Sequence, residues 1–131
     1  MDGKVLIVED EPHIVESLRF ILSRAGFDVT AVEDAESGMA SLASERPDVM
    51  VLDAMLPGAS GFEMLRAIRS TPAISHLPVL MLTAKGQRRD REVAEDIGAD
   101  MFMTKPFANA EVVDAVRELA SRKRAERGAP S

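Results

Sequence analysis

Residues Val49–Gly61, which read VMVLDAMLPGASG, decide how the rest of the chain is interpreted. The four apolar residues 49–52 are typical of a strand that is buried on both faces of a parallel sheet. Asp53 ends this run, and Pro57-Gly58 predicts a turn shortly after it. Because ligands bind at the carboxyl ends of the strands in open α/β sheets, we expect Asp53 to lie where chemistry takes place.

The composition is typical of one globular domain. The chain has 131 residues, of which 46% are hydrophobic and 29% charged, and it is long enough to bury a core. It has no cysteine, which excludes disulfides and thiolate metal sites. No apolar run has the length of a membrane span, and residues 1–4 lack the layout of a signal peptide. We therefore expect a cytoplasmic protein that has no contact with a membrane.

Charge is distributed unevenly along the chain. The net charge of −6 argues against direct binding of nucleic acid by this domain. A polar segment at the end, by contrast, carries Arg122, Lys123, Arg124 and Arg127 against the single acid Glu126. We expect residues 1–121 to form the domain and residues 122–131 to be a basic tail or the start of a linker. The sequence leaves open whether an output domain follows.

Apolar runs alternate with helical patterns along the whole chain. The strands are expected at residues 4–9, 28–32, 49–52, 79–83 and 101–105, with the second at an edge of the sheet. The helices are expected after Pro12, at 35–45, after Ser60, at 88–97 and from about Asn109, the last one fraying beyond Ala120. This order predicts a doubly wound α/β fold with a parallel sheet and helices on both faces.

Polar side chains end four of the five expected strands: Glu9 and Asp10, Asp53, Thr83, and Lys105. In a parallel sheet these ends point the same way, so we expect the side chains to meet. Three carboxylates held close together repel one another unless a positive charge lies among them. A magnesium ion (or Mn²⁺) with oxygen ligands would supply that charge, and Lys105 would add a second one.

An aspartate beside a metal ion and an ammonium group can attack a phosphoryl group and form an acyl phosphate. The metal ion and Lys105 would neutralise the charge on the phosphoryl oxygens, and the Thr83 hydroxyl would donate a hydrogen bond to one of them. The sequence therefore indicates that phosphoryl transfer takes place on Asp53.

At this point the chain resembles the response-regulator receiver domains of two-component signalling. The matching motifs lie at four strands and read VLIVEDEP, VMVLDAMLPGASG, PVLMLTAKG and GADMFMTKPF. The resemblance covers about residues 3–121 and implies a flavodoxin-like (βα)5 fold with strand order 2-1-3-4-5.

The resemblance also implies roles for individual residues. Asp53 would be the phospho-acceptor, with Thr83 and Lys105 as the other signature residues of the reaction. Asp10 would bind magnesium directly, Glu9 would act through water, and the main-chain carbonyl of Met55 would be a further ligand. Two further features follow from the resemblance, a cis Lys105-Pro106 bond and an aromatic switch at Phe102 that works with Thr83.

In function, the resemblance implies a switch that takes its phosphoryl group from a sensor histidine kinase or a histidine phosphotransfer protein. The face of the fourth helix, fifth strand and last helix would then regulate an effector protein or output domain. A homodimer linked to phosphorylation is compatible with this reading. The only chemistry expected is self-phosphorylation and self-dephosphorylation, so the chain is not expected to be an enzyme.

Three residues are expected to modulate the loss of the phosphoryl group. Met55 and Lys85 each lie two positions past a site residue and flank the path of the attacking water in this fold. Methionine cannot orient a water, so phospho-Asp53 is expected to be long-lived. Ala84 is small and leaves the site open to a phosphodonor.

Three other functions compete with this interpretation. A phosphatase with an aspartate nucleophile generally has a second carboxylate two residues later, where this chain has Met55. A receiver that only binds partners would not need all five strand-end residues. A nucleotide-binding flavodoxin-like domain would have a glycine-rich loop after the first strand, and this chain has none there.

Overall fold

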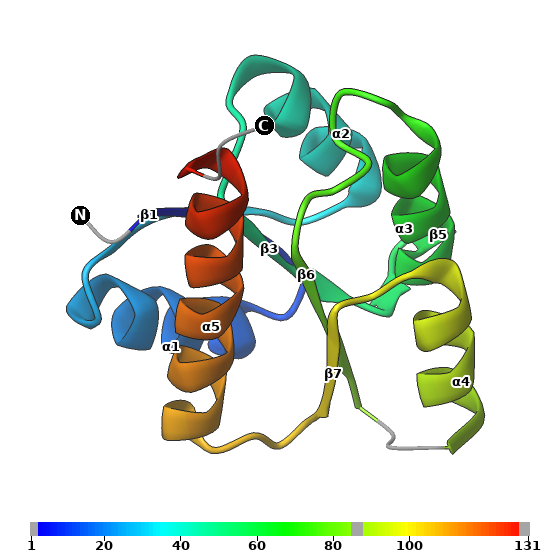
Figure 1. The fold of residues 1–131 in the computed structure, drawn as a ribbon. Helices are drawn as coiled ribbons and strands as arrows, with labels where there is room; N and C mark the ends of the chain where they lie inside the picture. The colour runs from blue at the N-terminus through cyan, green and yellow to red at the C-terminus, as the bar shows by residue number, and fades with distance from the viewer. Residues whose placement is uncertain (1–2, 85–87, 129–131) are drawn as a thin grey trace.

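A five-stranded parallel sheet lies between two layers of helices in the computed structural model, which describes residues 3–84 and 88–128 (Figure 1). The strands are β1 (Gly3–Val8), β2 (Phe27–Val32), β3 (Val49–Asp53), β6 (Val79–Thr83) and β7 (Met101–Thr104). Their order is β2-β1-β3-β6-β7, and every pair is parallel. Counted within this sheet alone, the order is the expected 2-1-3-4-5, with β2 at an edge. The doubly wound fold is confirmed.

Four helices connect successive strands of the sheet and a fifth follows the last strand: α1 (Pro12–Arg24), α2 (Ala35–Ser44), α3 (Gly61–Ser70), α4 (Arg88–Ile97) and α5 (Asn109–Gly128). Local sequence explains two of their starts. The Asp34 carboxylate accepts a hydrogen bond from the Ser37 N–H at 2.7 Å, and the Ser60 hydroxyl accepts one from the Glu63 N–H at 3.2 Å. The first of these bonds holds the pKa of Asp34 below its usual value. None of the helices in the described part of the chain combines the length and the apolar character that crossing a membrane requires.

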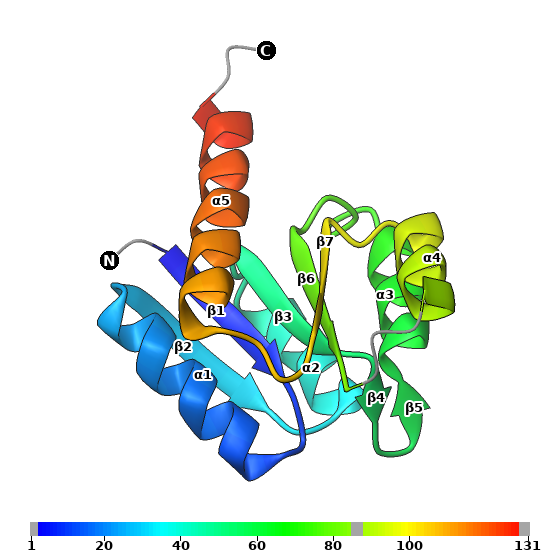
Figure 2. The same cartoon turned by 90° about the horizontal axis from the view of Figure 1, so that it is seen from below.

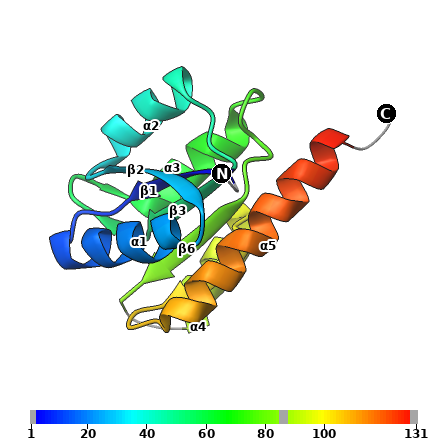
Figure 3. The same cartoon turned by 90° about the vertical axis from the view of Figure 1, so that its left-hand side faces the viewer.

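Alternation along the strands divides the core between the two faces of the sheet. On one face, Ile7, Val51 and Leu80 pack against α1 and α5. On the other, residues such as Met50 and Met81 pack against α2, α3 and α4. Figure 3 shows α1 and α5 on the opposite side of the sheet from α2 and α3. β3 lies in the middle of the sheet, and all five of its residues are buried, which agrees with its apolar sequence.

Two local features differ from the expectation. A small antiparallel hairpin of β4 (Met55–Leu56) and β5 (Ala59–Ser60) follows β3, where the sequence predicts only a turn; Gly58, with φ +76°, provides that turn. The last helix does not fray beyond Ala120 but continues to Gly128 and projects past the sheet (Figure 2). Lysine, arginine, alanine and glutamate dominate residues 122–127, and they are good helix formers. The division at residue 121 stays a prediction.

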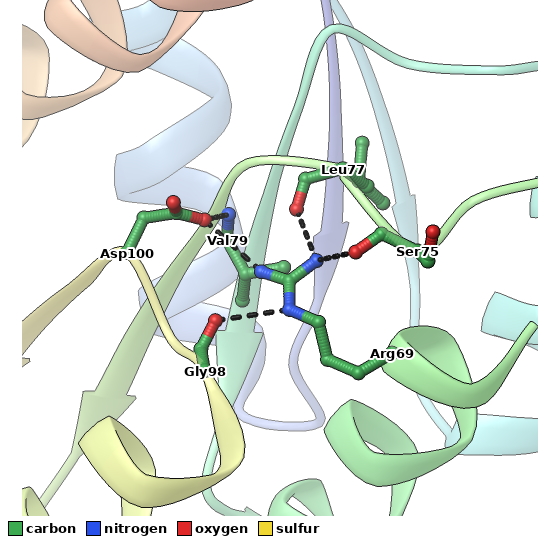
Figure 4. A network of polar contacts seen from close by, with 6 residues as sticks. All are labelled: Arg69, Ser75, Leu77, Val79, Gly98 and Asp100. Carbon is green, nitrogen blue, oxygen red and sulfur yellow. Dashed lines mark hydrogen bonds and ion pairs between the residues drawn. The ribbon is translucent and has the colours of Figure 1, made fainter. Parts of the chain in front are cut away.

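Arg69, near the end of α3, forms a network at the edge of the sheet where β6 and β7 begin (Figure 4). Its guanidinium group donates to the carbonyl oxygens of Gly98 at 2.9 Å, Ser75 at 3.0 Å and Leu77 at 2.7 Å. It also pairs with the Asp100 carboxylate at 3.0 Å, and that carboxylate accepts the Val79 N–H at 2.8 Å. The network fastens the end of α4 to α3 and to the start of β6.

Candidate functional site

The carboxyl ends of four strands bring the expected polar residues together. Glu9 and Asp10 follow β1, Asp53 ends β3, Thr83 ends β6, and Lys105 follows β7. Glu9, Asp53 and Thr83 are buried, each with 3% or less of its surface exposed, and they are the buried polar residues of the described chain. The main-chain carbonyl of Thr83 accepts the Lys105 N–H at 2.7 Å. The predicted convergence of the strand ends is therefore present in the structure.

Lys105 links two of the carboxylates. Its Nζ lies 2.5 Å from Glu9 Oε1 and 3.4 Å from Asp53 Oδ2, and its side chain is only 10% exposed. Burial lowers the pKa of the Lys105 ammonium group, but the hydrogen bond to Glu9 and the charge of Asp53 outweigh that effect, so its pKa lies above its usual value. Lys105 therefore keeps its positive charge.

The surroundings of Glu9 disfavour the charged form of its carboxyl group. Burial raises the pKa of its carboxyl group, and the adjacent Asp53 raises it further, while Lys105 and the Glu11 N–H, 3.2 Å from Oε2, lower it. The net effect on the pKa is a rise. Three carboxylates face one ammonium group here, so the site has an excess of negative charge that a divalent cation would balance.

The same residues could hold such a cation. Oxygen atoms of Glu9, Asp10 and Asp53 all lie within 4.8 Å of one another, and carboxylate oxygens are ligands that magnesium prefers. Asp10 is exposed while the other two are buried, so the cluster opens to solvent on one side. These residues fit a hard divalent ion. The main-chain carbonyl of Met55 as a further ligand stays a prediction.

Met55 holds Asp53 through its backbone. The Met55 N–H donates to Asp53 Oδ1 at 3.1 Å, whereas the Met55 side chain points to solvent, with 70% of the residue exposed. Ala84 is also exposed, and its role in access for a phosphodonor stays a prediction. Lys85, the other predicted modulating residue, lies outside the described residues.

Phe102 is half-buried in β7 and packs against the core cluster that contains Met81, its partner in β6. Strand alternation places Thr83 on the same face of the sheet as Met81, so Thr83 and Phe102 share that face. The guanidinium carbon of Arg91 lies 5.3 Å from the centre of the Phe102 ring, a cation–π contact that the sequence does not reveal.

Gly61 packs against the backbone of Asp53 and Ala54, a role that the sequence analysis did not predict. Its N–H donates to the Ala54 carbonyl at 2.9 Å, and a Cβ at this position would overlap the Asp53 carbonyl oxygen. The sequence feature that could have indicated this role is a glycine directly after Ser60, the residue that caps α3. The cis peptide bond between Lys105 and Pro106 is present as the resemblance implies.

Removal of one carboxylate should weaken cation binding. We expect Asp10→Asn to reduce the affinity for Mn²⁺ by about tenfold or more, because a unit charge about 4 Å from a cation contributes several kcal/mol even at a high effective dielectric constant. Electron paramagnetic resonance of free Mn²⁺ measures this binding directly. Glu16→Gln, which removes an exposed acid of α1, is the control. Equal affinities in the two variants would contradict this assignment.

Comparisons with known proteins agree with the geometry. A family model described as the response regulator receiver domain matches residues 5–117. The alkaline phosphatase synthesis transcriptional regulatory protein PhoP of Bacillus subtilis (strain 168) is 40% identical over 131 residues, which cover 100% of this chain and 53% of that protein. The chain thus spans about half the length of this relative.

Solved structures give the same result. The signal receiver domain of a signal transduction histidine kinase from Syntrophus aciditrophicus has a TM-score of 0.85 and 32% identity, covering 92% of this chain and 91% of its own. The receiver domain of sensor histidine kinase PA1611 from Pseudomonas aeruginosa PAO1 has a TM-score of 0.83 and 28% identity. The match covers 91% of this chain and 98% of that one. That structure has a magnesium ion coordinated in its active site cleft. This chain belongs to the response regulator receiver domain family.

Proposed function

We propose that this chain is a magnesium-dependent switch that accepts a phosphoryl group on Asp53 from a phosphohistidine of a sensor histidine kinase or a histidine phosphotransfer protein. One observation carries the proposal. A buried aspartate at the end of the central strand is held beside the Lys105 ammonium group, within 4.8 Å of oxygen atoms of two other carboxylates.

The contacts of Asp53 orient it for attack. The Met55 N–H holds Oδ1 and Lys105 lies beside Oδ2, so the plane of the carboxylate is fixed. One carboxylate oxygen bonds to phosphorus, the bond from phosphorus to the imidazole nitrogen breaks, and the nitrogen leaves with the electron pair. Lys105 then pairs with a phosphoryl oxygen, and the Thr83 hydroxyl donates to another. When bound, magnesium neutralises charge on the phosphoryl oxygens.

The site supports the chain's own phosphorylation and dephosphorylation, not turnover of small phosphate esters. A phosphatase needs an acid–base group near its nucleophile to protonate the leaving group and activate water. The side chain two residues after Asp53 is the thioether of Met55, which does neither. The phospho-aspartate therefore serves as a stored signal.

Asp53→Asn should abolish phosphoryl uptake. The amide is not a nucleophile, so the variant incubated with Mg²⁺ and acetyl phosphate should gain no phosphoryl group by intact mass spectrometry, while the native chain gains one. Asp28→Asn, on an exposed position of β2, should behave like the native chain. Phosphoryl uptake by Asp53→Asn equal to that of the native chain would overturn the proposal.

The proposed output surface consists of α4, β7 and α5. Ala94 is the buried residue of α4, with Val93 and Ile97 half-buried, so few apolar contacts hold this helix. Its end at Gly98 is nevertheless fixed by Arg69 (Figure 4). We propose that the phosphoryl group draws Thr83 inward, that Phe102 turns toward the vacated space, and that the start of α4 repacks about its fixed end.

Hydrogen exchange should detect this change. With beryllofluoride and Mg²⁺, amides of residues 88–93 should change their exchange rates more than amides of residues 94–100, because the Arg69 network holds the latter. Peptides of α1 provide the internal control and should not change. Equal exchange over residues 84–100 with and without beryllofluoride would rule out this movement.

The phosphoryl group is proposed to be long-lived because the solvent-exposed Met55 side chain cannot orient the attacking water. Met55→Asn adds an amide at this position, and we expect it to speed decay about two- to tenfold, which corresponds to one hydrogen bond to the water in the transition state. Loss of the phosphoryl group after removal of the donor measures the rate. Decay that is unchanged or slower would refute this role of Met55.

Partners and compartment follow from the proposed chemistry. The α4, β7 and α5 surface would act on an effector protein or on an output domain in a longer chain, and a homodimer linked to phosphorylation would use the same surface. The net charge of −6 supports a protein partner over direct nucleic-acid binding by this domain. We place the chain in the cytoplasm, where ATP-dependent kinases act.

A further inference from the structure

Met55 combines two properties that no other methionine in the described part of the chain shares. Its side chain is exposed to solvent, and its backbone is bonded to the proposed phospho-acceptor. The residue is 70% exposed, whereas the three methionines of the inner core are at most 3% exposed: Met50, Met64 and Met81. Three others are half-buried: Met39, Met101 and Met103. Among the methionines at residues 3–84 and 88–128, a solvent-borne oxidant should therefore reach Met55 first.

The backbone around Met55 is fixed on every side. β4 pairs Met55 with Ser60 and Leu56 with Ala59. The Ala54 N–H donates to the Leu82 carbonyl at 2.8 Å, and the Met55 N–H donates to Asp53 Oδ1. A change confined to the Met55 side chain leaves these main-chain bonds in place. The side chain therefore starts from a fixed point beside Asp53.

We propose that Met55 is an oxidation site through which a peroxide shortens the lifetime of the phosphorylated state. The Met55 sulfur attacks one oxygen of hydrogen peroxide, the O–O bond breaks, and a sulfur–oxygen bond forms. Sulfur is oxidised to the sulfoxide by two electrons, and the other peroxide oxygen takes up the proton of the transferred oxygen and leaves as water. Methionine sulfoxide reductases reverse the reaction, so the modification can act as a signal.

The consequence for the site rests on the proposed phosphorylation of Asp53. A thioether sulfur is a weak hydrogen-bond acceptor, whereas a sulfoxide oxygen is a strong one. Oxidation therefore replaces a weak acceptor beside Asp53 with a strong one, which would hold the water that attacks phosphorus. The oxygen of that water forms a bond to phosphorus, the bond to the Asp53 oxygen breaks, and the released carboxylate keeps the electron pair. A proton of the water passes to solvent, and inorganic phosphate leaves.

The test uses the whole chain treated briefly with hydrogen peroxide. Peptide mass mapping should show the sulfoxide at Met55 before it appears at Met101 or Met103. The treated chain, phosphorylated with acetyl phosphate and Mg²⁺, should lose its phosphoryl group about two- to tenfold faster than the untreated chain. Methionine sulfoxide reductase should restore the slow rate. Met55→Leu, which cannot be oxidised at this position, should lose the effect, and Met103→Leu should retain it.

Three outcomes would overturn the proposal: oxidation of Met55 no faster than that of Met101 and Met103, decay that is unchanged or slower once Met55 is oxidised, or acceleration that persists in Met55→Leu. Failure of the proposed function is a separate result. In that case the untreated chain takes up no phosphoryl group, although the peptide map still shows selective oxidation, and the regulatory proposal falls with it.

Discussion

The charge balance at the carboxyl ends of β1, β3 and β7 is the constraint on which the rest of the structure depends. Glu9 and Asp53 are almost completely buried, and Lys105 lies between them. Buried charges are tolerated only when they are paired and hydrogen-bonded. The end of a strand is the place where a chain can leave the apolar core and still have backbone donors close by, as the N–H groups of Glu11 and Met55 show. β3 lies at the centre of the sheet, with the acidic pair directly after the neighbouring strand β1 and Thr83 at the end of the other neighbour, β6.

The amino ends and the carboxyl ends of the strands carry charge networks of opposite kinds. At the edge where β6 and β7 begin, Arg69 has four fixed acceptors, among them Gly98 and Asp100, so its charge and its donors are satisfied. At the carboxyl ends of the strands, three carboxylates face one ammonium group, so negative charge remains. The Arg69 network is satisfied by its own acceptors, whereas the carboxylate site has negative charge that a cation would balance. α4 runs from the carboxyl end of β6 back to the amino end of β7. Arg69 fixes its last turn, and few apolar contacts hold the rest of the helix.

The sequence was sufficient for features that depend on local pattern and strand direction. Apolar runs located the five strands of the main sheet, and the rule that parallel strands end at the same edge was enough to group Asp53 with Glu9 and Lys105. Features that depend on contacts between distant residues were missed. Arg69 has the spacing of an ordinary helix residue, and its acceptors are as far as 31 positions away. The hairpin after β3 is too short for a periodic signal, and the need for Gly61 follows only from its position under Asp53.

Met55 shows how such a site can be tuned without being rebuilt. Its backbone orients Asp53, while its side chain faces solvent and has no packing role in the core. Glu9 and Lys105 are different, because they pair with each other and Lys105 also pairs with Asp53, so removal of Lys105 leaves two buried carboxylates without their ammonium partner. Replacement of Glu9 or Lys105 would change the surroundings of Asp53, the proposed phospho-acceptor. Under the proposed function, a change in the Met55 side chain would instead alter how water approaches the phosphoryl group. On that proposal, substitution or modification at this position would change the lifetime of the signal while the contacts of Glu9, Asp53 and Lys105 that form it are retained.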